Sequence, residues 1–214
     1  IVILLLLIIT ISCGDNDEPI VNTETNTLEF FQELDISYGN DSDQVFDLYL
    51  PANRTANTKV MILIHGGGWT SGDKVEMNDF KNFILQNIPD IAVVNMNYRL
   101  ADNTTQAYPM QINDITSVVN YLKTKQNEYV ISNELGFIGV SAGAHLSMLW
   151  SYAFDTDNQT NMVCSIVGPT NFTDPAYLES TNPILQEILD VYGVDATIEF
   201  LEEVSPFHQV TASA

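Results

Sequence analysis

Four short segments of the chain are almost continuously apolar: KVMILIH (59–65), IAVVNMNY (91–98), LGFIGV (135–140) and MVCSIVG (162–168). Runs of this length predict strands covered on both faces, as in a parallel sheet. The segments between them show the spacing of amphipathic helices. Residues 80–88 would place Phe80, Phe83, Ile84 and Ile88 on one face, and residues 110–124 would do the same with Ile112, Ile115, Val119 and Leu122.

Upstream of these runs, residues 44–51 (QVFDLYLP) alternate between apolar and mixed positions, which predicts a half-exposed strand that stops at Pro51. Strands without an intervening helix, followed by a β-α-β-α-β series, favour a mainly parallel α/β sandwich with an antiparallel N-terminal edge. Downstream of residue 168 the pattern changes to short helical patches. One would begin at the cap Asn182, and another at the cap Asp195.

The first thirteen residues, IVILLLLIITISC, are too short an apolar run to span a bilayer. They resemble an export signal that lacks its start, and the TISC box predicts lipidation of Cys13, as in bacterial lipoproteins. A plain secretory signal with a chance cysteine is the alternative. Residues 14–27 are polar and acidic, which predicts a flexible tether, so residues 28–214 would form the folded domain.

The chain has seven basic and 28 acidic side chains, for a net charge of −21. Such a surface repels nucleic acid and predicts no nucleic-acid partner. Cys164 has no partner if Cys13 is lipidated, so a disulfide framework is excluded. Because it lies in an apolar run, we expect Cys164 to be a small core residue.

The pentapeptide GVSAG (139–143) has the spacing Gly-x-Ser-x-Gly, after a predicted buried strand and before a helical segment. In that context the motif indicates a sharp turn that presents Ser141 as a nucleophile near the positive end of a helix. A helix start with Ser141 as its N-cap is the alternative.

A second glycine motif, LIHGGGW (63–69), follows a different predicted strand. Consecutive glycines are costly in chain entropy, and outward-facing N–H groups that stabilise an oxyanion would explain them. Gly67 and Gly68 could supply two such donors, and Ala142 a third. A phosphate loop would need Lys at Asp73, and a dinucleotide fingerprint would need Gly at Ser71.

The motifs FDLYLP, HGGGW, NYRL (97–100) and GVSAGAHL occur in this order in the α/β-hydrolase superfamily, which the chain resembles from about residue 34 to residue 208. It is similar to the branch with hormone-sensitive-lipase-like carboxylesterases, bacterial feruloyl and acetyl-xylan esterases and arylformamidases. The resemblance implies a three-layer α/β sandwich, Ser141 as nucleophile, and Gly67, Gly68 and Ala142 as the oxyanion hole. It implies no cofactor.

In this superfamily the triad acid and histidine follow the nucleophile. His65 would brace the oxyanion loop, His145 lies in the helix after Ser141, and only His208 is late in the sequence. We therefore expect the acid and base to lie beyond residue 214, with the domain incomplete at its C-terminus and this chain a poor catalyst. The alternatives are a catalytically dead relative, and a triad completed by Asp174 and His208.

Trp69 and His145 are weaker candidates for substrate contact, and a core role for Trp69 is the alternative. Three scattered histidines show no metal-ligand spacing. The sequence thus predicts an exported serine carboxylic-ester hydrolase, lipid-anchored in the bacterial outer membrane and acting on small esters or acyl groups of plant polysaccharides. An arylformamidase and a non-catalytic surface binding lipoprotein are the rival hypotheses.

Overall fold

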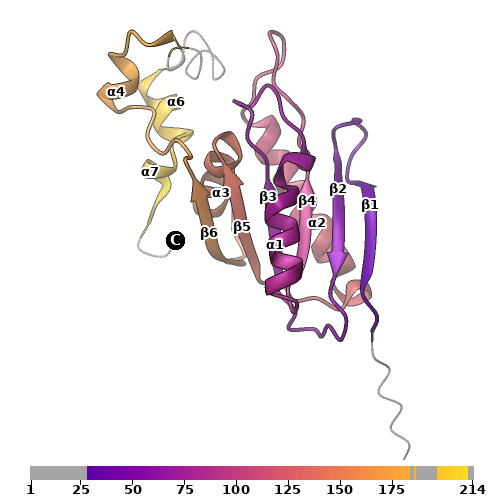
Figure 1. Ribbon diagram of the computed structural model, residues 1–214. Helices are drawn as coiled ribbons and strands as arrows, with labels where there is room; N and C mark the ends of the chain where they lie inside the picture. Colours follow the sequence, from indigo (N-terminus) through magenta and orange to yellow (C-terminus); the bar gives the residue numbers. More distant parts are fainter. Residues whose placement is uncertain (1–27, 184–185, 187–196, 212–214) are drawn as a thin grey trace, which may run out of the picture.

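The computed structural model describes residues 28–183, 186 and 197–211. Its centre is a six-stranded sheet with the strand order β1-β2-β4-β3-β5-β6 (Figure 1). Pairing is antiparallel between β1 and β2 and between β2 and β4, and parallel for the other three pairs. The strands are β1 (Phe31–Ser37), β2 (Val45–Leu50), β3 (Val60–Ile64), β4 (Ala92–Met96), β5 (Leu135–Val140) and β6 (Thr160–Ile166).

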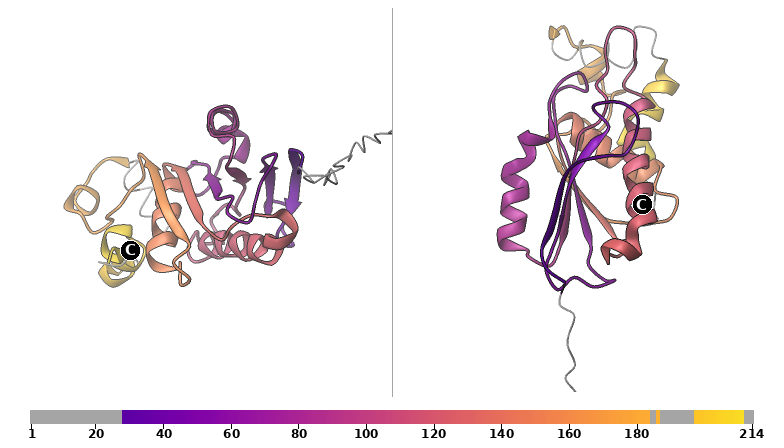
Figure 2. Two further views of the ribbon diagram at one scale, coloured as in Figure 1. Left: turned by 90° about the horizontal axis from the view of Figure 1, so that it is seen from below. Right: turned by 90° about the vertical axis from the view of Figure 1, so that its right-hand side faces the viewer.

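Helices cover both faces of the sheet (Figure 2). Helix α1 (Asn78–Asn87) lies on one face, and α2 (Met110–Tyr129) and α3 (Ala142–Ala153) lie on the other. The short helices α4 (Pro175–Leu178), α6 (Ile198–Glu203) and α7 (Pro206–Gln209) lie beyond the β6 edge, and the 3-10 turn η1 (Lys74–Met77) precedes α1. This confirms the predicted three-layer α/β sandwich with an antiparallel N-terminal edge.

The larger core lies between the sheet and helices α2 and α3. The apolar residues predicted for one face of α2, namely Ile112, Ile115, Val119 and Leu122, are all buried there. A smaller core under α1 combines side chains of β2, β3 and β4 with Ile84 and Met77. Burial of these two apolar layers supplies the main favourable term in folding.

Strand β2 is buried on both faces, so the prediction of a half-exposed strand is wrong. Asp47 and Tyr49, on the face expected to meet solvent, are only 7% and 6% exposed. The buried Asp47 carboxylate is neutralised by the Lys74 ammonium, whose Nζ lies 2.6 Å from Asp47 Oδ1. Burial lowers the pKa of Lys74, but the hydrogen bonds to Asp35 and Asp47 outweigh it and the pKa is raised.

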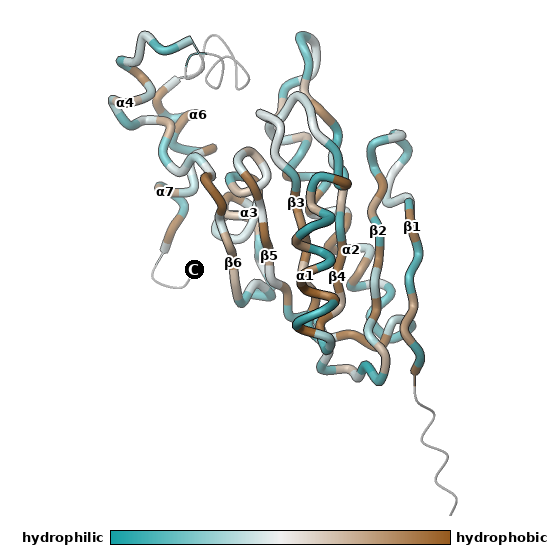
Figure 3. The backbone as a smooth tube through the Cα atoms, viewed as in Figure 1, coloured by the Kyte–Doolittle hydropathy of each residue, from teal (hydrophilic) through white to brown (hydrophobic). Residues whose placement is uncertain are grey.

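Among the described residues, strand β6 lies at the edge of the sheet and is largely exposed. Its apolar run, whose hydropathy can be followed in Figure 3, predicted burial on both faces. Met162 is 46% exposed, and Cys164 is exposed as well. The expectation that Cys164 is a core residue is therefore wrong. An apolar run shows that a strand can be buried on both faces. The position of the strand in the sheet decides whether both faces are in fact buried.

Helix α1 buries a narrower stripe than predicted. Phe80 and Ile84 pack toward the sheet, whereas Phe83 is 60% exposed on the flank of the helix. Ile88 is 42% exposed because the helix ends at Asn87. Helix α6 is capped by Thr197, whose side chain accepts a hydrogen bond from Phe200 N–H. The expected cap Asp195 lies outside the described residues.

Several expectations lie outside the described residues: the export signal and Cys13, the tether at residues 14–27, and most of the helix expected after Asn182. Within residues 28–183, 186 and 197–211, no helix has the length and apolar character to cross a membrane. The same residues contain no cluster of three or more His, Cys, Asp or Glu side chains suited to a metal ion.

Candidate active site

Ser141 stands on the sharp turn between β5 and α3. Its backbone angles are φ 51° and ψ −114°, in a region that residues with a Cβ rarely adopt. The turn is held on both sides, because Ser141 N–H donates to Ile166 O at 2.8 Å and His145 N–H donates to Ser141 O at 3.1 Å. Ser141 is partly exposed, and its hydroxyl takes part in none of the hydrogen bonds found among the described residues. Strain held at an accessible polar residue is typical of a functional site.

The glycines two positions before and after Ser141 are required by close backbone contacts. A Cβ on Gly139 would lie 2.3 Å from Gly143 O, across the turn itself. A Cβ on Gly143 would lie 2.3 Å from the carbonyl oxygens of Ile64 and His65, at the end of β3. The Gly-x-Ser-x-Gly spacing thus allows both the tight turn and the close packing of α3 on β3.

The glycine loop after β3 adopts a left-handed backbone over three consecutive residues. The φ angles of Gly67, Gly68 and Trp69 are 107°, 57° and 64°. The carbonyl oxygen of Gly67 accepts hydrogen bonds from Thr70 N–H, Ser71 N–H and the Ser71 hydroxyl. A side chain at Gly67 would clash with the Ser71 backbone, whereas Gly68 faces open space. The loop is therefore tightly folded at its base and accessible at its tip.

The two loops meet at Gly66. A Cβ on Gly66 would lie 3.1 Å from Val140 O and 3.4 Å from Ser141 Cβ, so the glycine loop passes directly beside the serine turn. Among the described residues, the backbone N–H groups of Gly67, Gly68 and Ala142 donate no hydrogen bond. Amides of this kind next to a nucleophile are what an oxyanion hole requires.

His65 is buried within the glycine loop. Its Nδ1 lies 2.7 Å from Gly66 O, which makes Nδ1–H the donor and leaves Nε2 unprotonated. The imidazole stacks on the ring of Tyr98 at 4.3 Å, and the Tyr98 hydroxyl donates to His65 O and Gly66 O. Burial lowers the pKa of His65, so the ring is neutral and holds the loop in place.

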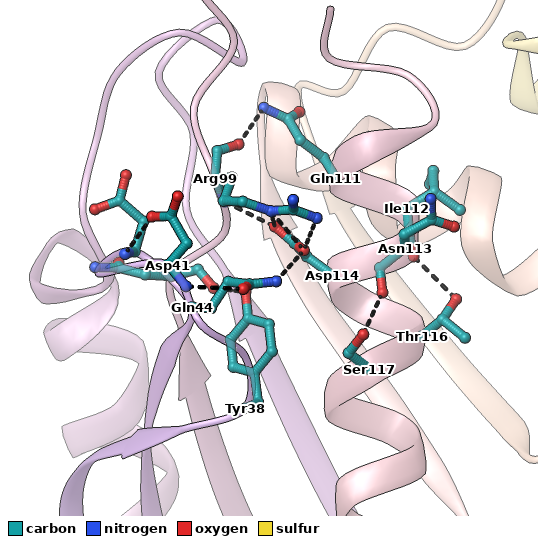
Figure 4. Close-up of polar contacts among 12 residues, drawn as sticks. Tyr38, Asp41, Gln44, Arg99, Gln111, Ile112, Asn113, Asp114, Thr116 and Ser117 are labelled. Carbon is teal, nitrogen blue, oxygen red and sulfur yellow. Dashed lines mark hydrogen bonds and ion pairs between the residues drawn. The ribbon is translucent and has the colours of Figure 1, made fainter. Parts of the chain in front are cut away.

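A buried polar network supports the loop from the α2 side (Figure 4). The fully buried Asp114 carboxylate pairs with the Arg99 guanidinium at 2.6 Å and also accepts from Gln44. Gln111, one turn earlier in α2, donates to Arg99 O at 2.9 Å and to Trp69 O at 2.7 Å. The hydrogen bond to Asp114 raises the pKa of Arg99. Helix α2 thus fixes the end of the glycine loop, a role that the sequence analysis missed.

Trp69 and His145 lie inside the core, with 1% and 0% exposure. Trp69 Nε1–H donates to His145 Nδ1 at 3.3 Å, and the two rings pack edge to face at 5.4 Å. His145 Nε2 lies 2.7 Å from Val204 O, at the end of α6. This placement favours internal support over direct substrate contact for both residues.

None of the three histidines contacts the Ser141 hydroxyl within the described structure. His65 and His145 use their rings inside the fold, while His208 Nε2 lies 2.9 Å from Thr173 Oγ1. Asp174 caps α4 by accepting from Ala176 N–H, and no hydrogen bond of the described residues joins it to His208. The structure therefore gives no support to an acid–base pair of Asp174 and His208.

The mainly parallel sheet, the serine turn after β5 and the glycine loop after β3 together define an α/β-hydrolase fold of the esterase type. The chain belongs to the BD-FAE family, whose model matches residues 46–214.

Solved structures share this fold. A bifunctional GH43-CE protein of Bacteroides eggerthii superposes with a TM-score of 0.69 at 21% identity, over 84% of this chain and 26% of that one. A truncated carbohydrate esterase from gut microbiota gives a TM-score of 0.67 at 19% identity, over 84% and 72%. Esterase B of Lactobacillus rhamnosis gives 0.64 at 23% identity, over 82% and 62%.

Among curated proteins, the chain is similar to versiconal hemiacetal acetate esterase of Aspergillus parasiticus, at 31% identity over 99 residues. The match covers 46% of this chain and 29% of the fungal esterase. The match spans less than a third of that relative, and this chain covers 26% of the GH43-CE protein and 62% of esterase B, so each of the three is longer than the part that this chain covers.

Proposed function

We propose that this protein hydrolyses carboxylic esters through an acyl-enzyme on Ser141. The observation that carries the proposal is the convergence of two loops. A strained, accessible serine lies beside Gly66 of a left-handed glycine loop, and the backbone amides of Gly67, Gly68 and Ala142 in these two loops donate no hydrogen bond among the described residues. Family membership supports the same chemistry.

In the proposed reaction Ser141 Oγ attacks the ester carbonyl carbon and gives its proton to a general base. The carbonyl oxygen becomes an oxyanion, held by the N–H groups of Gly67, Gly68 and Ala142. The bond to the alcohol then breaks, the alcohol leaves with the proton, and water hydrolyses the acyl-serine.

The proposal needs a general base other than His65, His145 and His208, because each of these rings is engaged elsewhere. The expectation that the acid and base lie downstream of residue 214 stays a proposal. It is supported by the greater length of the relatives.

For the substrate we propose acyl groups on plant polysaccharides or small esters. Two of the relatives of similar fold are described as a GH43-CE protein and a carbohydrate esterase, and the fungal relative is an acetate esterase. The accessible tip of the loop at Gly68 supports a site that a bulky ester can reach.

The test uses the full protein encoded by the gene that contains this chain. We expect it to hydrolyse p-nitrophenyl acetate and to release acetate from acetylated xylan. Ser141→Ala should lower turnover by about 10³-fold or more, while Ser42→Ala, at an exposed position on the β1–β2 loop, should not change it. Faster cleavage of aryl formamides would favour the formamidase hypothesis. Absence of any turnover would favour a non-catalytic binding protein.

We further propose that the protein is exported and anchored in the bacterial outer membrane by a lipid on Cys13. The apolar segment before Cys13 and the acidic residues after it support this. The sequence has two cysteines, which gives a matched control. Metabolic labelling with a palmitate analogue should be lost in Cys13→Ser and retained in Cys164→Ser. Unchanged labelling of Cys13→Ser would contradict the anchor.

A further inference from the structure

Three segments that are distant in sequence meet at the imidazole of His145. The residue lies in the first turn of α3, four positions after Ser141, and its N–H donates to Ser141 O. Its ring contacts Trp69 of the glycine loop and Val204 at the end of α6, and it packs against Phe172 with a centroid distance of 5.1 Å. The ring is fully buried, so it cannot touch a substrate.

The contact with Val204 determines the tautomer of His145. A carbonyl oxygen only accepts hydrogen bonds, so the 2.7 Å contact with Val204 O requires a proton on Nε2. In a neutral imidazole Nδ1 then carries a lone pair, and it accepts from Trp69 Nε1–H. Burial holds the pKa of His145 at about 4, so the ring is neutral near pH 7. Val204 O at the end of α6 thus fixes the tautomer in which Nδ1 can accept the hydrogen bond from Trp69.

Trp69 is held on two sides, and this bears directly on the glycine loop. Its carbonyl oxygen accepts from Ala101 N–H at 2.9 Å and from Gln111 Nε2 at 2.7 Å, while its indole is bound by His145. A bulky residue at φ 64° is strained, and such a conformation persists only where the surroundings enforce it. Trp69 directly follows Gly67 and Gly68, so fixing Trp69 fixes the two amides.

We propose that His145 is a positioning residue, which aligns the glycine loop with Ser141 through its hydrogen bond to the Trp69 indole. This inference rests on the proposed function, because the loop is taken as the oxyanion hole. It also makes the geometry of the site depend on the segment 197–209, although no side chain of that segment hydrogen-bonds to the Ser141 hydroxyl among the described residues. A small misplacement of positioned groups is enough to slow a reaction substantially.

Two substitutions separate the two hydrogen bonds of His145. In His145→Asn the amide oxygen occupies the place of Nδ1, and an acceptor for Trp69 is retained. In His145→Gln the amide nitrogen reaches the place of Nε2, so the donor to Val204 is retained and the acceptor for Trp69 is lost. If the His145 imidazole only filled space in the core, the Asn and Gln variants should affect the protein to about the same extent.

Two measurements on the full protein read out the effect. The first is the NMR signal of the Trp69 indole N–H. The sequence has two tryptophans, and Trp69→Phe assigns the signal against that of Trp150, which donates to Thr116. The second is the rate at which a fluorophosphonate labels the protein. We expect His145→Gln to shift the indole signal and to slow labelling by about tenfold or more, whereas His145→Asn preserves both.

The outcomes distinguish the two proposals. If wild-type protein is labelled, and His145→Gln is labelled at the wild-type rate or both variants are slowed equally, the positioning role of His145 is overturned. An indole signal that His145→Gln leaves in place overturns it too. If wild-type protein is not labelled, the proposed function fails, and the positioning role of His145 fails with it. A shift of the indole signal would then show only a structural hydrogen bond.

Discussion

The buried His145 imidazole makes a specific prediction about acid stability. Burial lowers its pKa from the ordinary 6.5 to about 4, and the hydrogen bond to Val204 O opposes this only in part. In the unfolded chain the ring takes up a proton below about pH 6.5, but in the folded protein it does so only near pH 4. Between these values the unfolded state binds more protons, so stability falls as the pH falls.

The size of the effect follows from the shift. Each pKa unit corresponds to about 1.4 kcal/mol, so a shift from 6.5 to about 4 is worth roughly 3 kcal/mol at its limit. At about pH 4.5 most of this, about 2.5 kcal/mol, is already lost. The full stabilisation is present only above about pH 6.5. Because the group is fully buried, solvent screening does not reduce the shift.

The assay compares wild type with His145→Asn by urea unfolding at several pH values between about 7.5 and 4.5. The other ionisable groups are the same in both proteins, so their contributions cancel in the difference. We expect the stability advantage of wild type to shrink by about 2–3 kcal/mol over this range. If the two proteins lose stability in parallel, the burial of a neutral His145 is wrong.

Three further substitutions test the site by the same measurement. Ser141→Gly should give a free energy of unfolding about 1 kcal/mol higher than that of Ser141→Ala, because glycine relieves the strained φ of 51°; equal values would contradict strain at the turn. Gly143→Ala should lower the free energy of unfolding by about 2 kcal/mol, because the alanine Cβ would lie 2.3 Å from carbonyl oxygens at the end of β3. An unchanged free energy of unfolding would mean that α3 packs less closely on β3. Asp114→Asn should lower the free energy of unfolding by about 2 kcal/mol, because Arg99 then loses its buried counter-charge. An almost unchanged free energy of unfolding would indicate an exposed ion pair instead.

The fold could be predicted well because its pattern is local. Apolar runs separated by helical spacing predicted strands β3 to β6 and helix α2, and the antiparallel edge followed from strands with no helix between them. Exposure could not be predicted in the same way. Met162 and Cys164 lie in an apolar run, yet β6 is an edge strand, and edge position depends on strand order.

The serine turn and the glycine loop could be predicted from the sequence, because each is a short motif whose glycines are required by the backbone geometry. The buried polar side chains that support these two loops could not be predicted. Asp114 and Arg99 are 15 residues apart, and Lys74 reaches Asp47 over 27. In the sequence, each of these charged residues looks like an ordinary surface residue. Its neighbours along the chain do not indicate that it forms a buried ion pair with a distant residue. His145 was noticed, but its role as a link between Trp69 and Val204 depends on three-dimensional contacts alone.

The most direct test of the central claim is a crystal structure of the full protein after reaction with a phosphonate ester, which mimics the tetrahedral intermediate. We predict a covalent bond from Ser141 Oγ to phosphorus. We also predict that the phosphoryl oxygen lies about 2.7–3.1 Å from at least two of the amide nitrogens of Gly67, Gly68 and Ala142. A phosphoryl oxygen that points into solvent, or an adduct on another residue, would contradict it.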